Sequence, residues 1–252
     1  MNINYVLEGE SDRTIVFIHG LSDSLQYWQK LSCKLKDDYQ ILRYDIRGHG
    51  RSGLECEGFT IDLLVDDLHS LLLELNLSRV SLIGFSMGGN VALSFTLKYP
   101  EMVDRLIVMS SFSENDENLK SKFIEFRNAL NISFEEFYDV IIRYVLPEDV
   151  IEKNREALEC IKIQSAKTAN IEGIRMGIDM GFDFSITDEL SLITAPTLIL
   201  QGRDDDIISM HLANVLNENI ADSRLIVFDD TKHNLLIGRN FDEILKLIRM
   251  FV

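Results

Sequence analysis

The chain has 252 residues and is 46% hydrophobic, which is enough for one large domain with a complete core. Its 25 basic and 41 acidic residues give a net charge of −16. This balance argues against nucleic-acid and anionic-membrane partners, because both require clustered Lys and Arg side chains.

The first 111 residues alternate apolar strands with helices. Residues 60–75 form the clearest predicted helix, because their apolar residues recur at helical spacing. Strands that are continuous apolar runs, alternating with helices, predict a mostly parallel sheet covered on both faces. The predicted strands are 5–7, 14–18, 41–44, 80–83 and 105–109, and the other predicted helices are 24–35 and 90–98.

The pattern changes between residues 112 and 184, where only helical segments are predicted. Ser133 opens one helix with a capping box, and Pro147 stands in the first turn of another. Seven of the 14 Phe residues fall in this stretch. Helices so rich in Phe cannot bury themselves alone, so we expect a cap that packs over the loop edge of the sheet. We therefore assign 112–184 to a helical cap, and 1–111 with 185–252 to the core domain.

Strands and helices alternate again after the predicted cap. The chain enters a strand at 197–200 through Ala195 and Pro196, and a second strand follows at 225–228. Helices are predicted at 209–216 and 242–251. The polar loops that follow the two strands are candidate places for functional side chains, because open sheets bind ligands at the carboxyl ends of their strands.

The clearest functional signal is Gly84-Phe85-Ser86-Met87-Gly88, which lies between a predicted strand and a predicted helix. A strand that turns directly into a helix needs a tight elbow, and glycines allow the close backbone contacts of that turn. Ser86 at the apex would expose its Oγ beside the positive end of the helix. The alternative is a glycine-rich turn with a serine that has no catalytic role.

A serine nucleophile needs a base, and the base needs an acid that holds its tautomer. On such an elbow the order along the chain is Ser, then Asp or Glu, then His. Of the two histidines after Ser86, His211 lies in a helical pattern, whereas His233 follows a strand in a loop. We predict His233 as the base. The candidate acids all follow the strand 197–200, and they are Asp204, Asp205 and Asp206.

An oxyanion hole requires two backbone N–H groups. The residue after the nucleophile, Met87, supplies one, and Leu21 supplies the other from the loop after strand 14–18. An ordinary turn at the end of that strand is the alternative. The residues that we expect to contact the substrate are His19, Gly20, Phe85 and Phe112.

The compartment is predicted from cysteines and termini. Cys33, Cys56 and Cys160 are odd in number and widely separated, which fits reduced thiols better than disulfides or a metal site. The first residues lack the basic region and apolar run of a signal peptide, and no apolar run is long enough for a membrane span. We expect a cytoplasmic protein that is a monomer or homodimer.

Over nearly its full length the sequence resembles the α/β-hydrolase family of the small, single-lid type. The resemblance implies a mostly parallel, doubly wound α/β sheet with a helical cap after the sixth strand. It places the triad acid at Asp205, three residues after Gly202. The similar motifs are 19–21, the loop Asp45-Ile46-Arg47-Gly48-His49-Gly50-Arg51-Ser52, the elbow 84–89, the acid strand 195–205 and the histidine loop 230–234.

The resemblance implies a serine hydrolase that cleaves a carboxylic ester or similar acyl compound, without cofactor or metal. The Phe-rich cap predicts a small to medium, partly apolar substrate. The enzymatic alternatives are an enol-lactone hydrolase, a perhydrolase and a lyase of menaquinone synthesis. The non-enzymatic alternative is a ligand-sensing protein on the same fold. The lyase would need basic cap residues for an anionic substrate, such as Arg127, Arg143 or Arg175.

Overall fold

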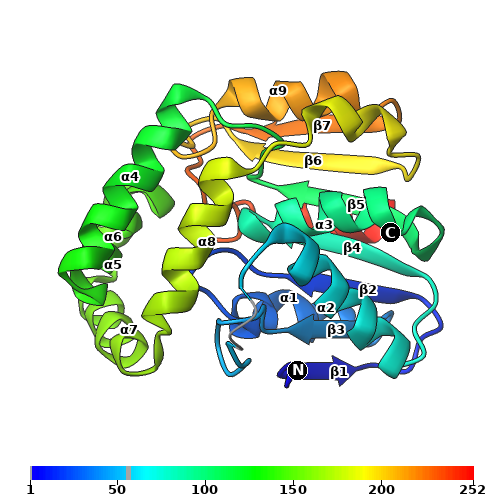
Figure 1. The fold of residues 1–252 in the computed structure, drawn as a ribbon, viewed down its shortest axis with the longest axis horizontal. Helices are drawn as coiled ribbons and strands as arrows, with labels where there is room; N and C mark the ends of the chain where they lie inside the picture. Colours follow the sequence, from blue (N-terminus) through cyan, green and yellow to red (C-terminus); the bar gives the residue numbers. More distant parts are fainter. Residues whose placement is uncertain (1, 55–57) are drawn as a thin grey trace.

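The computed structural model describes residues 2–54 and 58–252, so the prediction for Cys56 lies outside the described residues. These residues form one seven-stranded sheet with the order β1-β3-β2-β4-β5-β6-β7 (Figure 1). Only the edge strand β1 is antiparallel to its neighbour. The strands are β1 (Tyr5–Glu8), β2 (Thr14–Ile18), β3 (Gln40–Tyr44), β4 (Val80–Phe85), β5 (Val103–Met109), β6 (Thr197–Gly202) and β7 (Ser223–Phe228).

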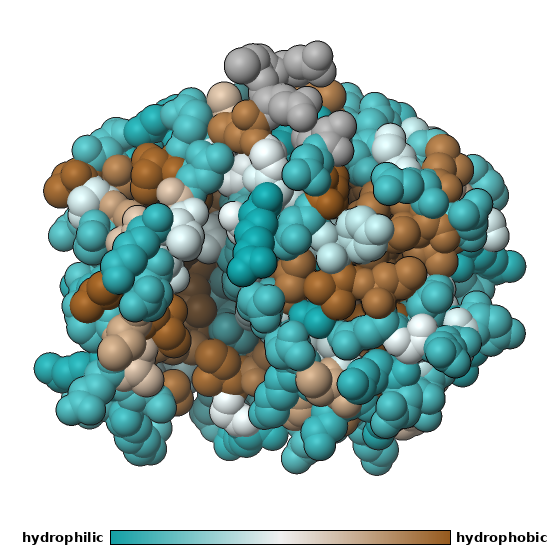
Figure 2. Space-filling model, turned by 90° about the horizontal axis from the view of Figure 1, so that it is seen from below, coloured by the Kyte–Doolittle hydropathy of each residue, from teal (hydrophilic) through white to brown (hydrophobic). Residues whose placement is uncertain are grey.

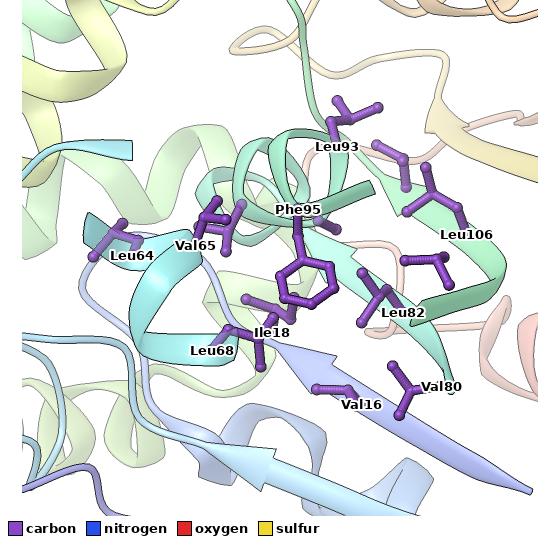
Figure 3. Packing of buried hydrophobic residues seen from close by; sticks show 14 of the residues in the cluster. Val16, Ile18, Leu64, Val65, Leu68, Val80, Leu82, Leu93, Phe95 and Leu106 are labelled. Atoms are coloured by element: carbon purple, nitrogen blue, oxygen red, sulfur yellow. The ribbon is translucent and has the colours of Figure 1, made fainter. Parts of the chain in front are cut away.

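Helices cover both faces of the sheet, as the apolar strands require. The side chains of Val16 and Ile18 belong to the core cluster on the face that α2, α3 and α9 cover, whereas Ile15 and Phe17 belong to the cluster on the face that α1 and α10 cover. Phe95 of α3 lies between α2 and the sheet, and it is fully buried (Figure 3). The covering helices are α1 (Gln29–Leu35), α2 (Ile61–Glu74), α3 (Met87–Lys98), α9 (Met210–Asn219) and α10 (Phe241–Phe251).

The segment between β5 and β6 forms a helical cap at one end of the molecule (Figure 1). Its described residues contain no strand before β6, in agreement with the pattern of the sequence. The cap follows the fifth strand and not the sixth, because the chain before β2 contributes only one strand to the sheet. Its helices are α4 (Glu117–Ile132), α5 (Phe134–Val145), α6 (Glu148–Lys153), α7 (Arg155–Thr168) and α8 (Ile171–Asp183).

The register of the central strands decides which loops meet. Ile18 of β2 lies opposite Gly84 of β4, so both strands end at the same level. Gly84 is likewise opposite Val108 of β5, and β6 continues the parallel set. The loop after Ile18 and the elbow at Ser86 therefore lie side by side beneath the cap. In the described part of the chain, no helix is both long and apolar enough to cross a membrane.

Candidate active site

Ser86 stands alone between β4 and α3 in a strained backbone conformation. Its φ and ψ are 51° and −120°, and φ values in this range cost a non-glycine residue on the order of 1–3 kcal/mol. The Ser86 N–H donates to the carbonyl oxygen of Met109 at 2.9 Å, which ties the elbow to β5. The neighbours of Ser86 are buried, whereas Ser86 itself is partly exposed and lines a cavity. The elbow thus presents its hydroxyl to this cavity.

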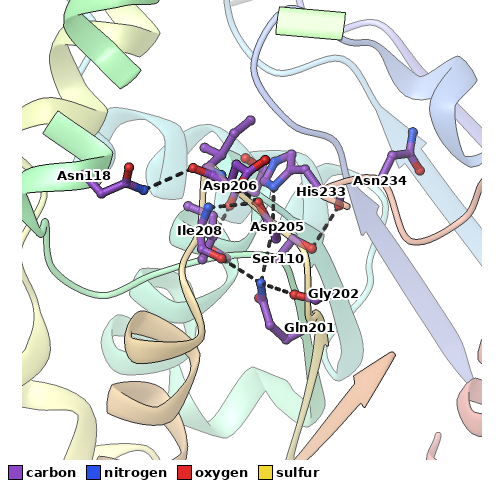
Figure 4. A network of polar contacts seen from close by, with 12 residues as sticks. Ser110, Asn118, Gln201, Gly202, Asp205, Asp206, Ile208, His233 and Asn234 are labelled. Carbon is purple, nitrogen blue, oxygen red and sulfur yellow. Dashed lines mark hydrogen bonds and ion pairs between the residues drawn. The ribbon is translucent and has the colours of Figure 1, made fainter. Parts of the chain in front are cut away.

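His233 and Asp205 form a buried pair. His233 Nδ1 lies 2.8 Å from Asp205 Oδ2, and the two residues are 4% and 6% exposed (Figure 4). Because an ionised carboxylate only accepts hydrogen bonds, the proton of a neutral His233 sits on Nδ1 and Nε2 keeps its lone pair. His233 lines the same cavity as Ser86. The pair can therefore supply a base to this cavity.

The backbone holds the Asp205 carboxylate in place. Its Oδ1 accepts the N–H groups of Ile207 and Ile208, each at 2.9 Å. The neighbouring acids are arranged differently: Asp204 and Asp206 are exposed, and the Asp206 carboxylate lies 4.0 Å from Lys232 Nζ. Of the three candidate acids, the structure brings Asp205 against His233. His211 is exposed on α9.

Two side chains that the sequence did not single out support this pair. Gln201 is fully buried, and its Nε2 donates to Asp205 Oδ2 at 3.2 Å and to the Ile208 carbonyl at 2.8 Å (Figure 4). Ser110 Oγ donates to the backbone carbonyl of His233 at 2.9 Å. Gln201 lies near the end of β6, and Ser110 directly follows β5. Their positions at the ends of strands are the only feature of the sequence that indicated this role.

The predicted oxyanion donors are the backbone N–H groups of Met87 and Leu21. Met87 is the first residue of α3, so its N–H has no partner within the helix. Leu21 follows β2, and within the described residues neither its N–H nor that of Met87 donates a hydrogen bond. Both residues line the cavity, and Gly20 lies so near that a Cβ there would come 3.3 Å from Ser86 Cβ. These two donors can together stabilise an oxyanion.

The cavity has a volume of about 350 Å³ and lies between core and cap. Phe85 and Phe112 line it, together with cap side chains from α4, α5 and α7 such as Phe126, Tyr138 and Leu158. Seen from below, the surface is hollowed between the cap and the core, and apolar side chains line the hollow (Figure 2). Asp23 is the one Asp, Glu, Lys or Arg among the described lining residues. Apart from Asp23, the described lining of the cavity is thus uncharged and largely apolar.

His19 and Gly20, which were expected to contact the substrate, are not among the described residues that line the cavity. His19 is fully buried, its Nε2 accepts the Ile46 N–H at 2.9 Å, and its Nδ1 lies 2.8 Å from the Gly20 carbonyl. Since Nε2 is an acceptor here, Nδ1 carries the proton and the ring is neutral. Both ring nitrogens hold backbone, so His19 positions the loop that carries Leu21.

This burial makes the stability of the protein depend on pH. Burial, with a smaller contribution from His49, lowers the pKa of His19 from 6.5 to about 3. The unfolded chain therefore binds the extra proton first, and the free energy of unfolding falls as pH decreases below about 6.5. At about pH 5 the expected contribution of His19 is a loss of about 2 kcal/mol.

Urea unfolding at about pH 7 and pH 5 measures this effect. The variant His19→Asn is expected to lose about 2 kcal/mol less than the native chain between these two values. His211→Asn changes an exposed histidine and serves as the matched control. Equal losses in the native chain and in His19→Asn would refute the assignment.

The three cap arginines that a lyase would need lie elsewhere. Arg127 pairs with Asp179, and Arg175 pairs with Glu172 at 2.6 Å. None of Arg127, Arg143 and Arg175 lines the cavity. The described lining of the cavity therefore lacks the basic side chains that the lyase alternative would need for an anionic substrate.

Metal-ligating side chains are dispersed in the described residues. No group of three or more His, Cys, Asp or Glu side chains in 2–54 and 58–252 is placed to hold a metal ion. Cys33 and Cys160 are exposed free thiols.

Known proteins are similar to this chain in sequence and in structure. A protein of Caulobacter sp. (strain K31) named "Putative carbamate hydrolase RutD" is 26% identical over 219 residues, which cover 85% of this chain and 82% of the relative. The 3-oxoadipate enol-lactonase 2 of Acinetobacter baylyi (strain ATCC 33305 / BD413 / ADP1) is 25% identical over 232 residues, 90% of this chain and 85% of that protein.

Among solved structures, the α/β-hydrolase MGS-M2 from a Medee basin deep-sea metagenome library superposes with a TM-score of 0.91. Its sequence is 21% identical, and the match covers 99% of this chain and 93% of that chain, so it supports the fold alone. The model of the family Hydrolase_4, described as serine aminopeptidase S33, matches residues 9–240. The fold, the elbow and this match agree, and the chain belongs to that family of α/β-hydrolases.

Proposed function

We propose that this hydrolase cleaves carboxylic esters or similar acyl compounds through an acyl-enzyme on Ser86. The observation that carries the proposal is one cavity lined by both Ser86 and His233, with His233 bound to the buried Asp205. A hydroxyl, a neutral imidazole and a carboxylate in this order can activate a serine nucleophile. In this proposal the N–H groups of Leu21 and Met87 bind the oxyanion.

The reaction follows from these groups. His233 Nε2 takes the Ser86 proton while Oγ attacks the acyl carbon, and the two N–H groups stabilise the oxyanion. The protonated His233 then gives its proton to the leaving alcohol as the carbon–oxygen bond breaks. Water attacks the acyl-enzyme in the second half, with His233 again as base, and releases the acid and free Ser86.

Asp205 stabilises the charged form of His233 in this scheme. Its carboxylate accepts hydrogen bonds from Ile207, Ile208, Gln201 and His233. These hydrogen bonds fix the orientation of the carboxylate toward the imidazole of His233. Gln201 acts through Asp205 and is a positioning residue.

The choice among acyl substrates rests on the lining of the cavity and on the relatives. Phe85 and Phe112 lie in an apolar cavity of about 350 Å³, which suits a small to medium acyl group. A lactone is a cyclic ester that the same groups would open, and the enol-lactonase relative favours this second candidate. The lyase alternative is weakened by the missing cationic lining, and a purely sensing role does not require the Asp205–His233 pair.

Hydrolysis of p-nitrophenyl esters of increasing acyl length tests the proposal. The native protein is expected to hydrolyse short to medium esters, and Ser86→Ala should lower kcat by a factor of about 10⁴ or more. A fluorophosphonate probe should label the native protein and not Ser86→Ala, which reads the nucleophile without any substrate. Cofactor addition is not expected to be required.

Ser121→Ala, which removes an exposed hydroxyl on α4, is the matched control and should keep native activity. Activity or labelling that survives in Ser86→Ala would refute the acyl-enzyme. A folded native protein that hydrolyses neither esters nor lactones would refute the reaction class.

A further inference from the structure

Asp23 carries a carboxylate that the proposed reaction does not use, close in the sequence to the candidate oxyanion donor Leu21. It lies two residues after Leu21 and lines the main cavity, the 350 Å³ space already described. Its Oδ1 accepts the Ser24 N–H at 2.8 Å, and it forms no ion pair within the described residues. An acid at the edge of an apolar cavity without a cation is costly to keep ionised.

A second, polar cavity opens at Asp23. This side chamber has a volume of about 160 Å³ and shares Ser22, Asp23, Phe134 and Ser165 with the main cavity. Its further lining includes His49 and, from the cap, Thr168 and Asn170. The two cavities therefore meet where Asp23 stands, one apolar and the other rich in oxygen atoms.

The side chamber offers negative charge and hydrogen-bond acceptors without a basic side chain. Neither Lys nor Arg is among the described residues that line the two cavities. His49 Nδ1 lies 3.1 Å from the Arg47 carbonyl, and burial lowers the pKa of His49, so this ring is neutral near pH 7 and does not offset Asp23. Hydroxyl groups such as those of Ser165 and Thr168 can accept hydrogen bonds from a cationic donor.

We propose that the side chamber binds the ammonium group of the substrate, with Asp23 as its counter-ion, while the apolar remainder lies in the main cavity. This inference rests on the proposed function and narrows it to esters that carry a protonated amine or a quaternary ammonium group. A cation on the substrate can form the ion pair with the Asp23 carboxylate that no described residue forms. Phe134, which lines both cavities, places an aromatic ring near the same group.

The charges that face Asp23 agree with this role. Burial, together with the Asp45 carboxylate, raises the pKa of Asp23 to about 7 against the hydrogen bond from Ser24. The other titratable groups near it are Tyr27, whose pKa burial raises, His49 in the side chamber and His233 in the main cavity. Asp23 therefore gains its charge as pH rises through neutrality, and the preference for cations should rise with it.

Two matched substrate pairs test the inference. Butyrylcholine and 3,3-dimethylbutyl butyrate differ by a charge on the alcohol side, and p-nitrophenyl 6-aminohexanoate and p-nitrophenyl hexanoate differ on the acyl side. In at least one pair, kcat/KM of the native protein is expected to favour the cationic ester by about tenfold, mainly through KM. The ratio should increase between about pH 6 and pH 8. Because both esters of a pair use the same catalytic groups, the contribution of these groups cancels in the ratio.

Asp23→Asn removes the charge and is expected to reduce this ratio by about tenfold. Asp37→Asn, in an exposed turn after α1, changes the net charge of −16 by the same amount and should keep the native ratio. A native ratio near unity in both pairs, or an equal loss of the ratio in Asp37→Asn, would overturn the inference. The neutral esters report on the proposed function separately, since their hydrolysis needs Ser86 but not the side chamber.

Binding to Ser86→Ala gives an answer even without turnover. Calorimetry at about pH 8, where an alkylamine is protonated, should show tighter binding of hexylammonium than of hexan-1-ol. The difference should disappear when Asp23→Asn is added to Ser86→Ala. Equal binding of the two probes would refute the ammonium site.

Discussion

Replacement of His233 by alanine is expected to lower kcat for ester hydrolysis by about 10⁵–10⁶, which is close to the loss expected for the nucleophile itself. The reason is that Ser86 loses the group that takes its proton and returns it to the leaving alcohol. Asp205→Asn should cost about 10⁴, because the amide can hold the wrong tautomer of His233 and cannot stabilise its charged form. Initial rates with one p-nitrophenyl ester measure both variants.

His211→Ala and Asp206→Asn are the matched controls, since both residues are exposed and neither lines the main cavity. They should keep kcat within about threefold of the native value, as is usual for surface changes. The losses of His233→Ala and Ser86→Ala should not add in the double variant, because the residues act as one unit. Activity of His233→Ala within tenfold of native would show that another base serves Ser86.

Substitution of Gly88 by alanine is expected to destabilise the protein strongly. A Cβ at Gly88 would overlap the carbonyl oxygen of Ile18 and would lie 2.5 Å from that of His19. Both obstacles are backbone atoms of β2 and its loop, so a side-chain movement cannot relieve the overlap. The free energy of unfolding should fall by about 3 kcal/mol or more, as measured by urea unfolding.

Gly53→Ala is the control for this change. A Cβ at Gly53 meets no heavy atom of residues 2–54 and 58–252 within 4 Å, so the free energy of unfolding should stay within about 0.5 kcal/mol. If Gly88→Ala unfolds at the native urea concentration, the close contact between the elbow and β2 is not as the structure describes. The result also bears on activity, because the same contact sets the distance between Leu21 and Ser86.

The names of the relatives differ in the substrate they give. Carbamate and enol-lactone hydrolysis are in the names of relatives that are 25–26% identical. The ammonium site depends on Asp23 and the side chamber of this chain and is tested separately.

The sequence by itself determined the parts that depend on local patterns. Apolar runs and helical spacing predicted the alternating strands and helices, and Gly84 and Gly88 around Ser86 predicted the elbow. These features depend on the backbone geometry of a few consecutive residues. The types and spacing of those residues are therefore enough to predict them. The family resemblance added Asp205, the residue that the structure brings against His233.

The tertiary structure decided which distant segments meet. It gave His19 a positioning role, because Ile46, 27 residues away, donates to its ring. It brought the Ser110 hydroxyl to the backbone carbonyl of His233, across 123 residues. It also placed Asp23 in two cavities that cap residues line, and it placed none of the three cap arginines in the main cavity. Such contacts follow from strand register and from the path of the cap over the sheet, and no local pattern of residues encodes either.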